Sequence, residues 1–181
     1  MHQAEPEREL LQCYDEQGNP NGSKTREDMK ATTDCWGGIS NIWLVNDKAQ
    51  LLCSKRSEGL SGNPGKWQTY FGGHVPAGLS FREAALKELS EEIGIKFEDA
   101  DLFLVYQGKD DVNKKFFESY AVRFNGSSNN LIFTDGEITE ARWMTIEEYM
   151  EEENAHPEFW CNRCKPERQE AIRRWVDSFG V

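Results

Sequence analysis

Three glutamates, Glu88, Glu91 and Glu92, stand close together in the stretch KELSEEIGI. The preceding residues predict a helix over 80–93, because they are rich in Ala, Leu, Glu and Lys and because Ser80 is a good N-cap. Residues three and four apart share one face of a helix, so we expect the three carboxylates to point the same way. Such a cluster is either a solvated acidic face or a site for a hard cation, which prefers oxygen ligands.

Length and composition indicate one folded domain without a membrane span. The chain has 181 residues and six Trp, enough for a single hydrophobic core, and it contains no run of about 18 apolar residues. The N-terminus is polar and acidic, unlike a signal peptide. Five cysteines without a dense framework fit a reducing compartment better than a disulfide scaffold. We therefore expect a cytoplasmic protein.

The formal net charge of −11 argues against a long nucleic acid as partner. A small phosphorylated substrate remains compatible with this charge, because a bound divalent cation and a few local Lys or Arg side chains supply positive charge.

Strands are expected on both sides of the acidic helix, so the architecture should be mixed, with helices packed on a sheet. The predicted strands lie within 10–22 (a short strand and a turn), 38–47, 50–57, 67–74, 102–109, 114–124 and 140–146, and a glycine-rich loop covers 58–66. Further helices are expected at 24–31, 145–153 and 165–179. In the last of these, Ile172, Trp175, Val176 and Phe179 form one apolar stripe.

The run GGHVPAGLSFREAALKELSEEIGI, residues 72–95, resembles the Nudix box. That box reads glycine, five residues, glutamate, seven residues, Arg-Glu, aliphatic, any residue, Glu-Glu, any residue, glycine, aliphatic. The resemblance implies the Nudix fold, an α/β/α sandwich with a mixed central sheet. We expect a single Nudix domain over 1–181, with an N-terminal extension (1–33), a core (34–155) and a C-terminal helix (156–181).

The resemblance also implies a site for Mg²⁺ or Mn²⁺ and a hydrolase that cleaves diphosphate linkages. Glu88, Glu91 and Glu92 correspond to its carboxylate ligands and Gly73 to its carbonyl ligand. The ion would neutralise the diphosphate and activate the attacking water. A carboxylate would help to activate this water. The candidates are Glu91 or Glu92, and Glu118 on a predicted strand as the other one.

Two positions depart from the box. Leu79 stands where the box has its first glutamate, and Lys87 stands where it has arginine. In the family these side chains support the helix and loop rather than bind the metal. Lys87 can still offer charge to a neighbouring glutamate, but not a bidentate fork. The departures leave open a non-catalytic module that binds nucleotides or diphosphates.

The flanking sequence is similar to the branch of the family that looks like isopentenyl-diphosphate isomerase, including a Pro-Gly-x-Trp signature at 64–67. The isomerase needs a cysteine where this chain has Gly72, and most of its metal-binding histidines are missing. Only His74 and Glu118 remain of that constellation. We therefore predict a hydrolase, acting on a nucleoside diphosphate derivative or a related small diphosphate, and keep the isomerase as the less favoured alternative.

Candidate substrate-binding residues lie outside the box or beside its first glycine. Lys55 and Arg56 end a predicted strand and are candidates for holding a diphosphate, and His74 is a candidate for substrate contact. One Cys-x-x-Cys pair, Cys161 and Cys164, is weak evidence for zinc, which normally needs four ligands. Relatives that form dimers suggest a homodimer by analogy only.

Overall fold

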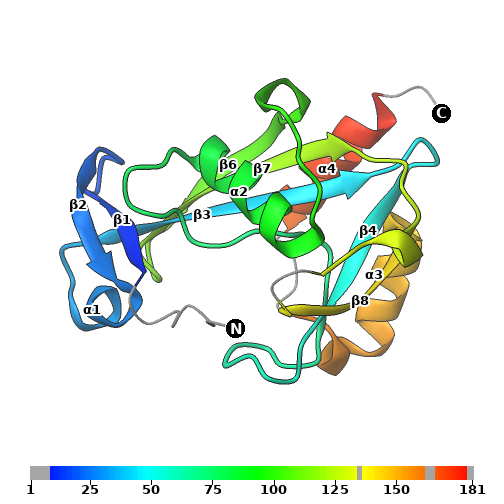
Figure 1. Ribbon diagram of the computed structural model, residues 1–181, viewed down its shortest axis with the longest axis horizontal. Coiled ribbons are helices and arrows are strands. Elements are labelled where there is room, and N and C mark those ends of the chain that lie inside the picture. The colour runs from blue at the N-terminus through cyan, green and yellow to red at the C-terminus, as the bar shows by residue number, and fades with distance from the viewer. Residues whose placement is uncertain (1–8, 134–135, 162–165, 179–181) are drawn as a thin grey trace.

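The computed structural model describes residues 9–133, 136–161 and 166–178, and these form an α/β/α sandwich around one mixed sheet (Figure 1). Its strands are β1 (Leu10–Tyr14), β2 (Pro20–Thr25), β3 (Trp36–Val45), β4 (Gln50–Arg56), β5 (Trp67–Gln68), β6 (Phe103–Asp110), β7 (Lys115–Arg123) and β8 (Ile138–Thr145). Its α-helices are α1 (Arg26–Ala31), α2 (Phe81–Ile93), α3 (Ile146–Ala155) and α4 (Pro166–Asp177). The predicted fold class is confirmed.

Strand β3 runs through the middle of the sheet. It pairs in parallel with β7, from Gly37 opposite Lys115 to Val45 opposite Arg123, and antiparallel with β1 and, at its end, with β4. Strands β2, β6 and β8 extend the sheet beside β1, β7 and β4. The residues predicted as an N-terminal extension thus contribute two strands to the same sheet.

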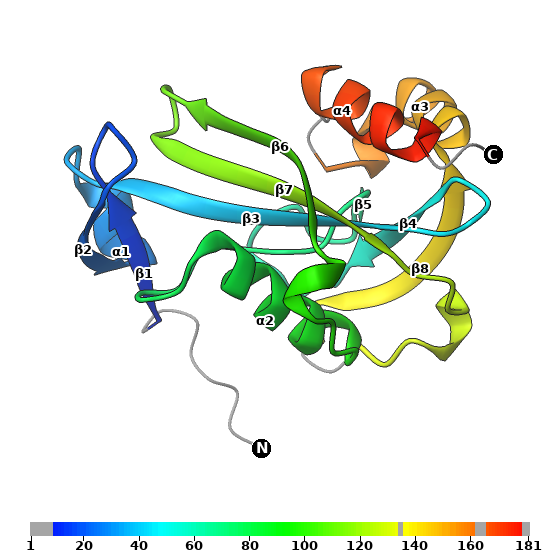
Figure 2. The ribbon, with the colours of Figure 1, turned by 90° about the horizontal axis from the view of Figure 1, so that it is seen from above.

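The two faces of the sheet carry different helices (Figure 2). Side chains alternate between faces along a strand, so the even-numbered residues of β3 and β7 share one face, here called the α2 face. There Ile42, Leu44 and Tyr120 pack against Leu89 and Ile93 of α2. The odd-numbered residues form the opposite face, here called the α4 face, where Trp43, Val45 and Ala121 join one cluster with Ile172 and Val176 of α4. None of the described helices is long and apolar enough to cross a bilayer.

Helix α2 begins and ends as the sequence predicts. The Ser80 hydroxyl accepts a hydrogen bond from the Glu83 backbone N–H, and the Glu83 carboxylate accepts one in return from the Ser80 N–H. Gly94 ends the helix in the left-handed conformation, at φ 70°, which costs glycine nothing. These two signals fix the rotation of the helix and therefore the direction in which its glutamates point.

The predicted strand over 67–74 is divided in two. Strand β5 covers only Trp67–Gln68 and pairs with β4. The chain then moves to β3, where Phe71 pairs with Ile42 and His74 with Ile39. Gly72 allows this change: its φ is 118°, and a Cβ there would lie 2.1 Å from the Ser40 carbonyl oxygen. Residues 20–22, predicted as part of a turn, instead open strand β2.

The cysteines differ from the reduced state that their number suggested. Cys13 and Cys35 form a disulfide, with Cα atoms 5.3 Å apart, because β1 pairs with the start of β3. Cys53 and Cys161 are buried free thiols, and burial raises the pKa of Cys53 to about 12. Cys164 and Phe179 lie outside the described residues, so the Cys-x-x-Cys pair and the last member of the predicted stripe remain predictions.

Candidate active site

The first two glycines of the 72–95 run, Gly72 and Gly73, lie directly against α2 and are here called the glycine turn. The Gly72 N–H donates a 2.9 Å hydrogen bond to the buried carboxylate of Glu92. A Cβ on Gly73 would lie 2.6 Å from the Glu88 carboxylate. Glycine at position 73 therefore leaves room for the Glu88 carboxylate beside the backbone.

Glu88 lies in an environment that disfavours its negative charge. Burial is the largest cause that raises its pKa, to about 7, and the nearby carboxylates Glu91, Glu137 and Glu9 raise it further, while Lys87 lowers it. A cation bound here would relieve both the burial and the repulsion.

Glu91 is tied to the side chain that replaces the box arginine. The Lys87 ammonium lies 2.7 Å from the Glu91 carboxylate, one helical turn away, and 3.7 Å from Glu9. The prediction that Lys87 offers its charge to a neighbouring glutamate is confirmed. The Glu91 side chain is 50% exposed, so it is the most open of the three box carboxylates.

The predicted metal ligands border the glycine turn without surrounding a common point. Across the described residues, no group of three or more His, Cys, Asp or Glu side chains could hold an ion. Like charges separate without a cation between them, and here Lys87 and the Gly72 N–H draw Glu91 and Glu92 apart. The donors are all oxygens, which suits Mg²⁺ or Mn²⁺, and Mg²⁺ usually takes one or two carboxylates plus water. The Gly73 carbonyl already accepts from the Ser40 N–H at 2.9 Å, which leaves its second lone pair.

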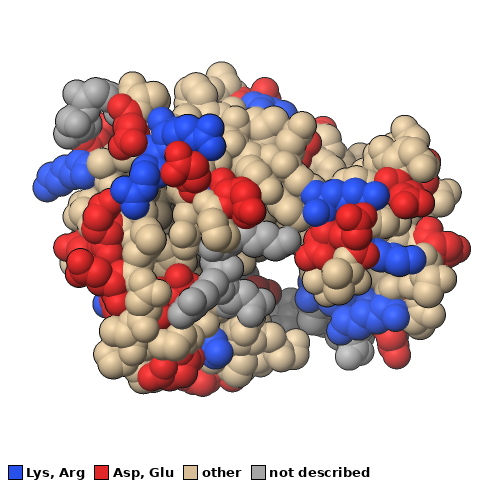
Figure 3. Space-filling view, turned by 180° about the vertical axis from the view of Figure 1, so that it is seen from behind, with Lys and Arg blue, Asp and Glu red and all other residues tan. Residues whose placement is uncertain are grey.

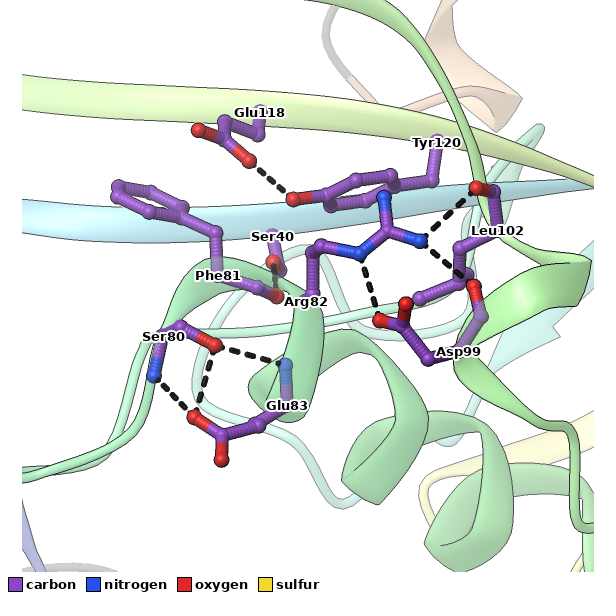
Figure 4. Close-up of polar contacts among 9 residues, drawn as sticks. All are labelled: Ser40, Ser80, Phe81, Arg82, Glu83, Asp99, Leu102, Glu118 and Tyr120. Atoms are coloured by element: carbon purple, nitrogen blue, oxygen red, sulfur yellow. Dashed lines mark hydrogen bonds and ion pairs between the residues drawn. The ribbon is translucent and has the colours of Figure 1, made fainter.

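Glu118 lies on the α2 face beside the opposite end of α2 (Figure 4). Its carboxylate accepts a hydrogen bond from the Tyr120 hydroxyl, and Arg82 lies over the Tyr120 ring at 5.4 Å. Burial and this bond raise the pKa of Tyr120. Arg82 itself is held by Asp99 at 2.6 Å. Arg82 and Glu88 are six residues apart on the helix, about 9 Å along its axis, so Glu118 meets the N-terminal turn of α2 rather than the glycine turn.

His74 faces away from the glutamates. It pairs with Ile39 and therefore lies on the α4 face, opposite the side on which Gly73 meets Glu88. Burial lowers its pKa to about 3, and Arg26, Lys115 and Lys30 lower it further. His74 is neutral at pH 7 and belongs to a basic neighbourhood.

Lys55 and Arg56 do not form one clamp. They are consecutive on β4, so their side chains leave opposite faces of the strand. Lys55 forms an ion pair with Glu140 at 2.8 Å, whereas the Arg56 Nε donates to the Gly62 carbonyl at 3.0 Å.

Two charged groups near these sites carry no signal in the sequence. Glu137, which precedes β8, acts on Glu88 because β8 pairs with β4 and brings distant residues to the glycine turn. Arg82 reaches Tyr120 beside Glu118 only through the packing of α2 on β7. Both positions depend on tertiary contacts, which a helix or strand pattern does not encode.

Comparisons with known proteins bear on the family and the fold. A family model of the NUDIX domain matches residues 38–161. An uncharacterized Nudix hydrolase of Pseudomonas aeruginosa is 29% identical over 178 residues, 98% of this chain and 99% of that protein. An isopentenyl-diphosphate Delta-isomerase of Klebsiella pneumoniae is 35% identical over 59 residues, 33% of this chain and 32% of that protein. A Deinococcus radiodurans crystal structure superposes with a TM-score of 0.72 at 24% identity, covering 92% of this chain and 98% of that one.

Proposed function

The chain belongs to the Nudix family and is a Nudix-type pyrophosphohydrolase, and from this premise we propose that Mg²⁺ or Mn²⁺ supports its reaction. The substrate would be a nucleoside diphosphate derivative or a related small diphosphate, cleaved at the diphosphate linkage. The single observation that carries the proposal is the buried Glu88 carboxylate, which packs against Gly73 among other carboxylates.

The residues of the glycine turn and α2 would divide the work. Glu88 and the Gly73 carbonyl would hold the ion, and Glu92 would fix the glycine turn through its bond to the Gly72 N–H. A bound divalent ion neutralises diphosphate oxygens and lowers the pKa of its water. Glu91, the most exposed of the three, would accept the proton from that water. Glu118, bonded to Tyr120 beside the other end of α2, is the weaker candidate.

Isomerase activity is disfavoured by the backbone at Gly72. The isomerase-like branch places its cysteine at this position, but here φ is 118° and a Cβ would lie 2.1 Å from the Ser40 carbonyl oxygen. A cysteine therefore does not fit without a shift of the backbone.

A non-catalytic module that binds a diphosphate is the second candidate. The observation that favours it is the ion pair between Lys87 and Glu91, because an ammonium at this carboxylate competes with a metal ion. Tight nucleotide binding without turnover under any divalent metal would support this candidate.

A cytoplasmic location and a homodimeric state also remain proposals. The cytoplasmic location conflicts with the Cys13–Cys35 disulfide, because cytosolic thiols are kept reduced. Alkylating a cell lysate before mass spectrometry would show whether both thiols are free, as a cytoplasmic protein requires. Sedimentation of the purified chain would give the number of subunits.

The test of the hydrolase is a substrate panel read by mass. It would contain nucleoside diphosphates and triphosphates, nucleotide sugars, dinucleotides and isoprenoid diphosphates, each with Mg²⁺ or Mn²⁺. We expect cleavage by the wild type and by Glu151→Gln, a matched change at an exposed residue of α3, and none by Glu91→Gln. Full metal-dependent cleavage by both Glu91→Gln and Glu92→Gln would show that the assigned roles are wrong.

A further inference from the structure

Basic side chains gather on the α4 face, on the other side of the sheet from the acidic glycine turn. Lys115, at the start of β7, pairs with Gly37 of β3, and His74 pairs with Ile39, so both lie on this face. Arg26 and Lys30 of α1 are close enough to lower the pKa of both His74 and Lys115. Arg26, Lys30 and Lys115 are here called the basic cluster.

Helix α1 is placed over this face by a glycine. A Cβ on Gly37 would lie 2.9 Å from the Met29 methyl carbon, so Met29 packs directly over Gly37. Arg26 and Lys30 are three residues before and one residue after Met29, so α1 sets both beside Lys115. Thr25 fixes the start of this helix by accepting a hydrogen bond from the Asp28 N–H.

The basic cluster has little compensation from acidic groups. Within the described ranges, Arg26, Lys30 and Lys115 take part in no ion pair, while eight of the other lysines and arginines do. Asp110 is the acidic residue that favours the charge of Lys115. In a chain with a net charge of −11, three unpaired cations side by side are unusual, and each keeps its hydrogen-bond donors available.

The surface beside the basic cluster is accessible. Arg26 and Lys30 are exposed and Lys115 is half-buried, although α4 reaches the neighbouring Phe117, whose ring centroid lies 5.6 Å from the Arg168 guanidinium. Figure 3, which views the molecule from behind, shows Lys and Arg side chains at the surface of this side, beside Asp and Glu side chains. A small anion can therefore approach the cluster from solvent.

We propose that Arg26, Lys30 and Lys115 form a second ligand site, which binds the phosphoryl group of a small phosphorylated compound. Ammonium and guanidinium donors form charge-assisted hydrogen bonds with phosphate oxygens, and these are the strong class of hydrogen bond. The compound is either the substrate itself, through a group distant from the cleaved linkage, or a separate phosphorylated ligand. The site does not depend on a metal ion.

The test is calorimetric titration with inorganic pyrophosphate in EDTA, which removes the metal-dependent contribution. We expect the wild type to bind, and the double variant Arg26→Gln/Lys30→Gln to bind about tenfold more weakly or worse. Lys115→Gln should show a similar loss, and Lys115→Arg should restore most of the affinity. Lys48→Gln/Lys96→Gln, with the same charge change at exposed residues outside the cluster, should bind as the wild type does.

Circular dichroism and chemical unfolding would show that each variant is folded. No pyrophosphate binding by the wild type overturns the proposal, and so does equal affinity in folded Arg26→Gln/Lys30→Gln and in the Lys48→Gln/Lys96→Gln control. Glu91→Gln should retain pyrophosphate binding in EDTA, so a failure of the hydrolase assignment leaves this result intact.

Kinetics with the substrate found by the panel would distinguish the two sources of the phosphoryl group. If the substrate supplies it, Lys115→Gln raises KM and leaves kcat within about twofold. If a separate ligand supplies it, Lys115→Gln binds pyrophosphate weakly but has the KM of the wild type.

Discussion

The glycine turn and the basic cluster are two crowded sets of like charges on opposite sides of one sheet. At the glycine turn, burial and neighbouring carboxylates raise the pKa of Glu88 to about 7. In the basic cluster, burial and neighbouring cations lower the pKa of Lys115. Strand β3 and its partners separate the two sets, so neither neutralises the other. The acidic side is therefore arranged to bind a cation, and the basic side is arranged to bind an anion.

The two sides differ in how they respond to pH. Glu88 can take up a proton near neutrality, so its charge at pH 7 depends on whether a cation is bound. In the basic cluster, burial and the neighbouring cations lower the pKa of Lys115, but from an ordinary value that lies far above neutrality. We therefore expect metal binding to depend on pH between about 6 and 8, and anion binding to stay nearly constant there.

The largest expected effect is on the acidic side. Glu91→Gln should lower kcat by about 100-fold or more, because the attacking water loses its proton acceptor. Steady-state hydrolysis with Mg²⁺ measures this, with Glu151→Gln as the control. An equal fall in kcat for Lys115→Gln would contradict the difference between the two sides, because the chemistry would then not be confined to the glycine turn.

Reducing the Cys13–Cys35 bond should affect the basic side selectively. The bond spans 22 residues and closes a loop that contains α1, so its loss should lower the free energy of unfolding by about 2–4 kcal/mol. Arg26 and Lys30 would also lose their fixed position, so pyrophosphate affinity should fall. Urea unfolding and titration of the Cys13→Ser/Cys35→Ser variant measure both. Mn²⁺ affinity should not change, and a matching loss of Mn²⁺ binding would contradict the separation of the two sites.

Glu88→Gln should stabilise the metal-free protein at alkaline pH. The folded pKa of about 7 lies above the ordinary value of 4.5, so the stability of the wild type is lost as pH rises through this window. Glu88→Gln has no carboxyl group to ionise at this position, so its stability does not fall in this pH window. Its advantage should be small near pH 5 and reach at most about 3 kcal/mol near pH 8, measured by urea unfolding in EDTA. An advantage independent of pH would mean that Glu88 is already ionised without metal.

The smallest expected effect has the opposite pH dependence. Burial, Arg26 and Lys30 lower the pKa of Lys115, whereas Asp110 raises it. The charge of Lys115 therefore costs stability below that lowered pKa, and the cost disappears as pH rises from it to the ordinary value of 10.5. Lys115→Met should therefore be more stable than the wild type at pH 7, by less than about 1 kcal/mol because the site is partly solvated. Unfolding at pH 7 and pH 10 tests this. An advantage that grows with pH would contradict it.

The parts of this protein that the sequence predicts are those set by local signals. Ser80, Gly94 and the spacing of Glu88, Glu91 and Glu92 fix helix α2 and its acidic face. The two predicted strands at 38–47 and 50–57, with a short turn between them, form the hairpin of β3 and β4. The prediction of a single strand over 67–74 was wrong, because Gly72 lets the chain move from its partner β4 to its partner β3.

The remaining features depend on which strands are neighbours. The disulfide requires β1 beside β3, and the basic cluster requires α1 over Gly37 and β7 parallel to β3. Residues 26, 74 and 115 are far apart in sequence and show no common pattern. Likewise, the separation of Lys55 from Arg56 follows from the pleat of β4, although their adjacency suggested one clamp.

The central claim is that the glycine turn and its glutamates bind a divalent cation. Electron paramagnetic resonance of added Mn²⁺ measures the free ion directly, across pH 6–8, for the wild type, Glu88→Gln, Glu91→Gln and Glu151→Gln. We predict that the wild type and Glu151→Gln bind Mn²⁺ equally and more tightly as pH rises, and that Glu88→Gln binds about tenfold more weakly or worse. Glu91→Gln, which loses the proton acceptor, should lose less Mn²⁺ affinity than Glu88→Gln. Equal Mn²⁺ binding by all four proteins would contradict the account.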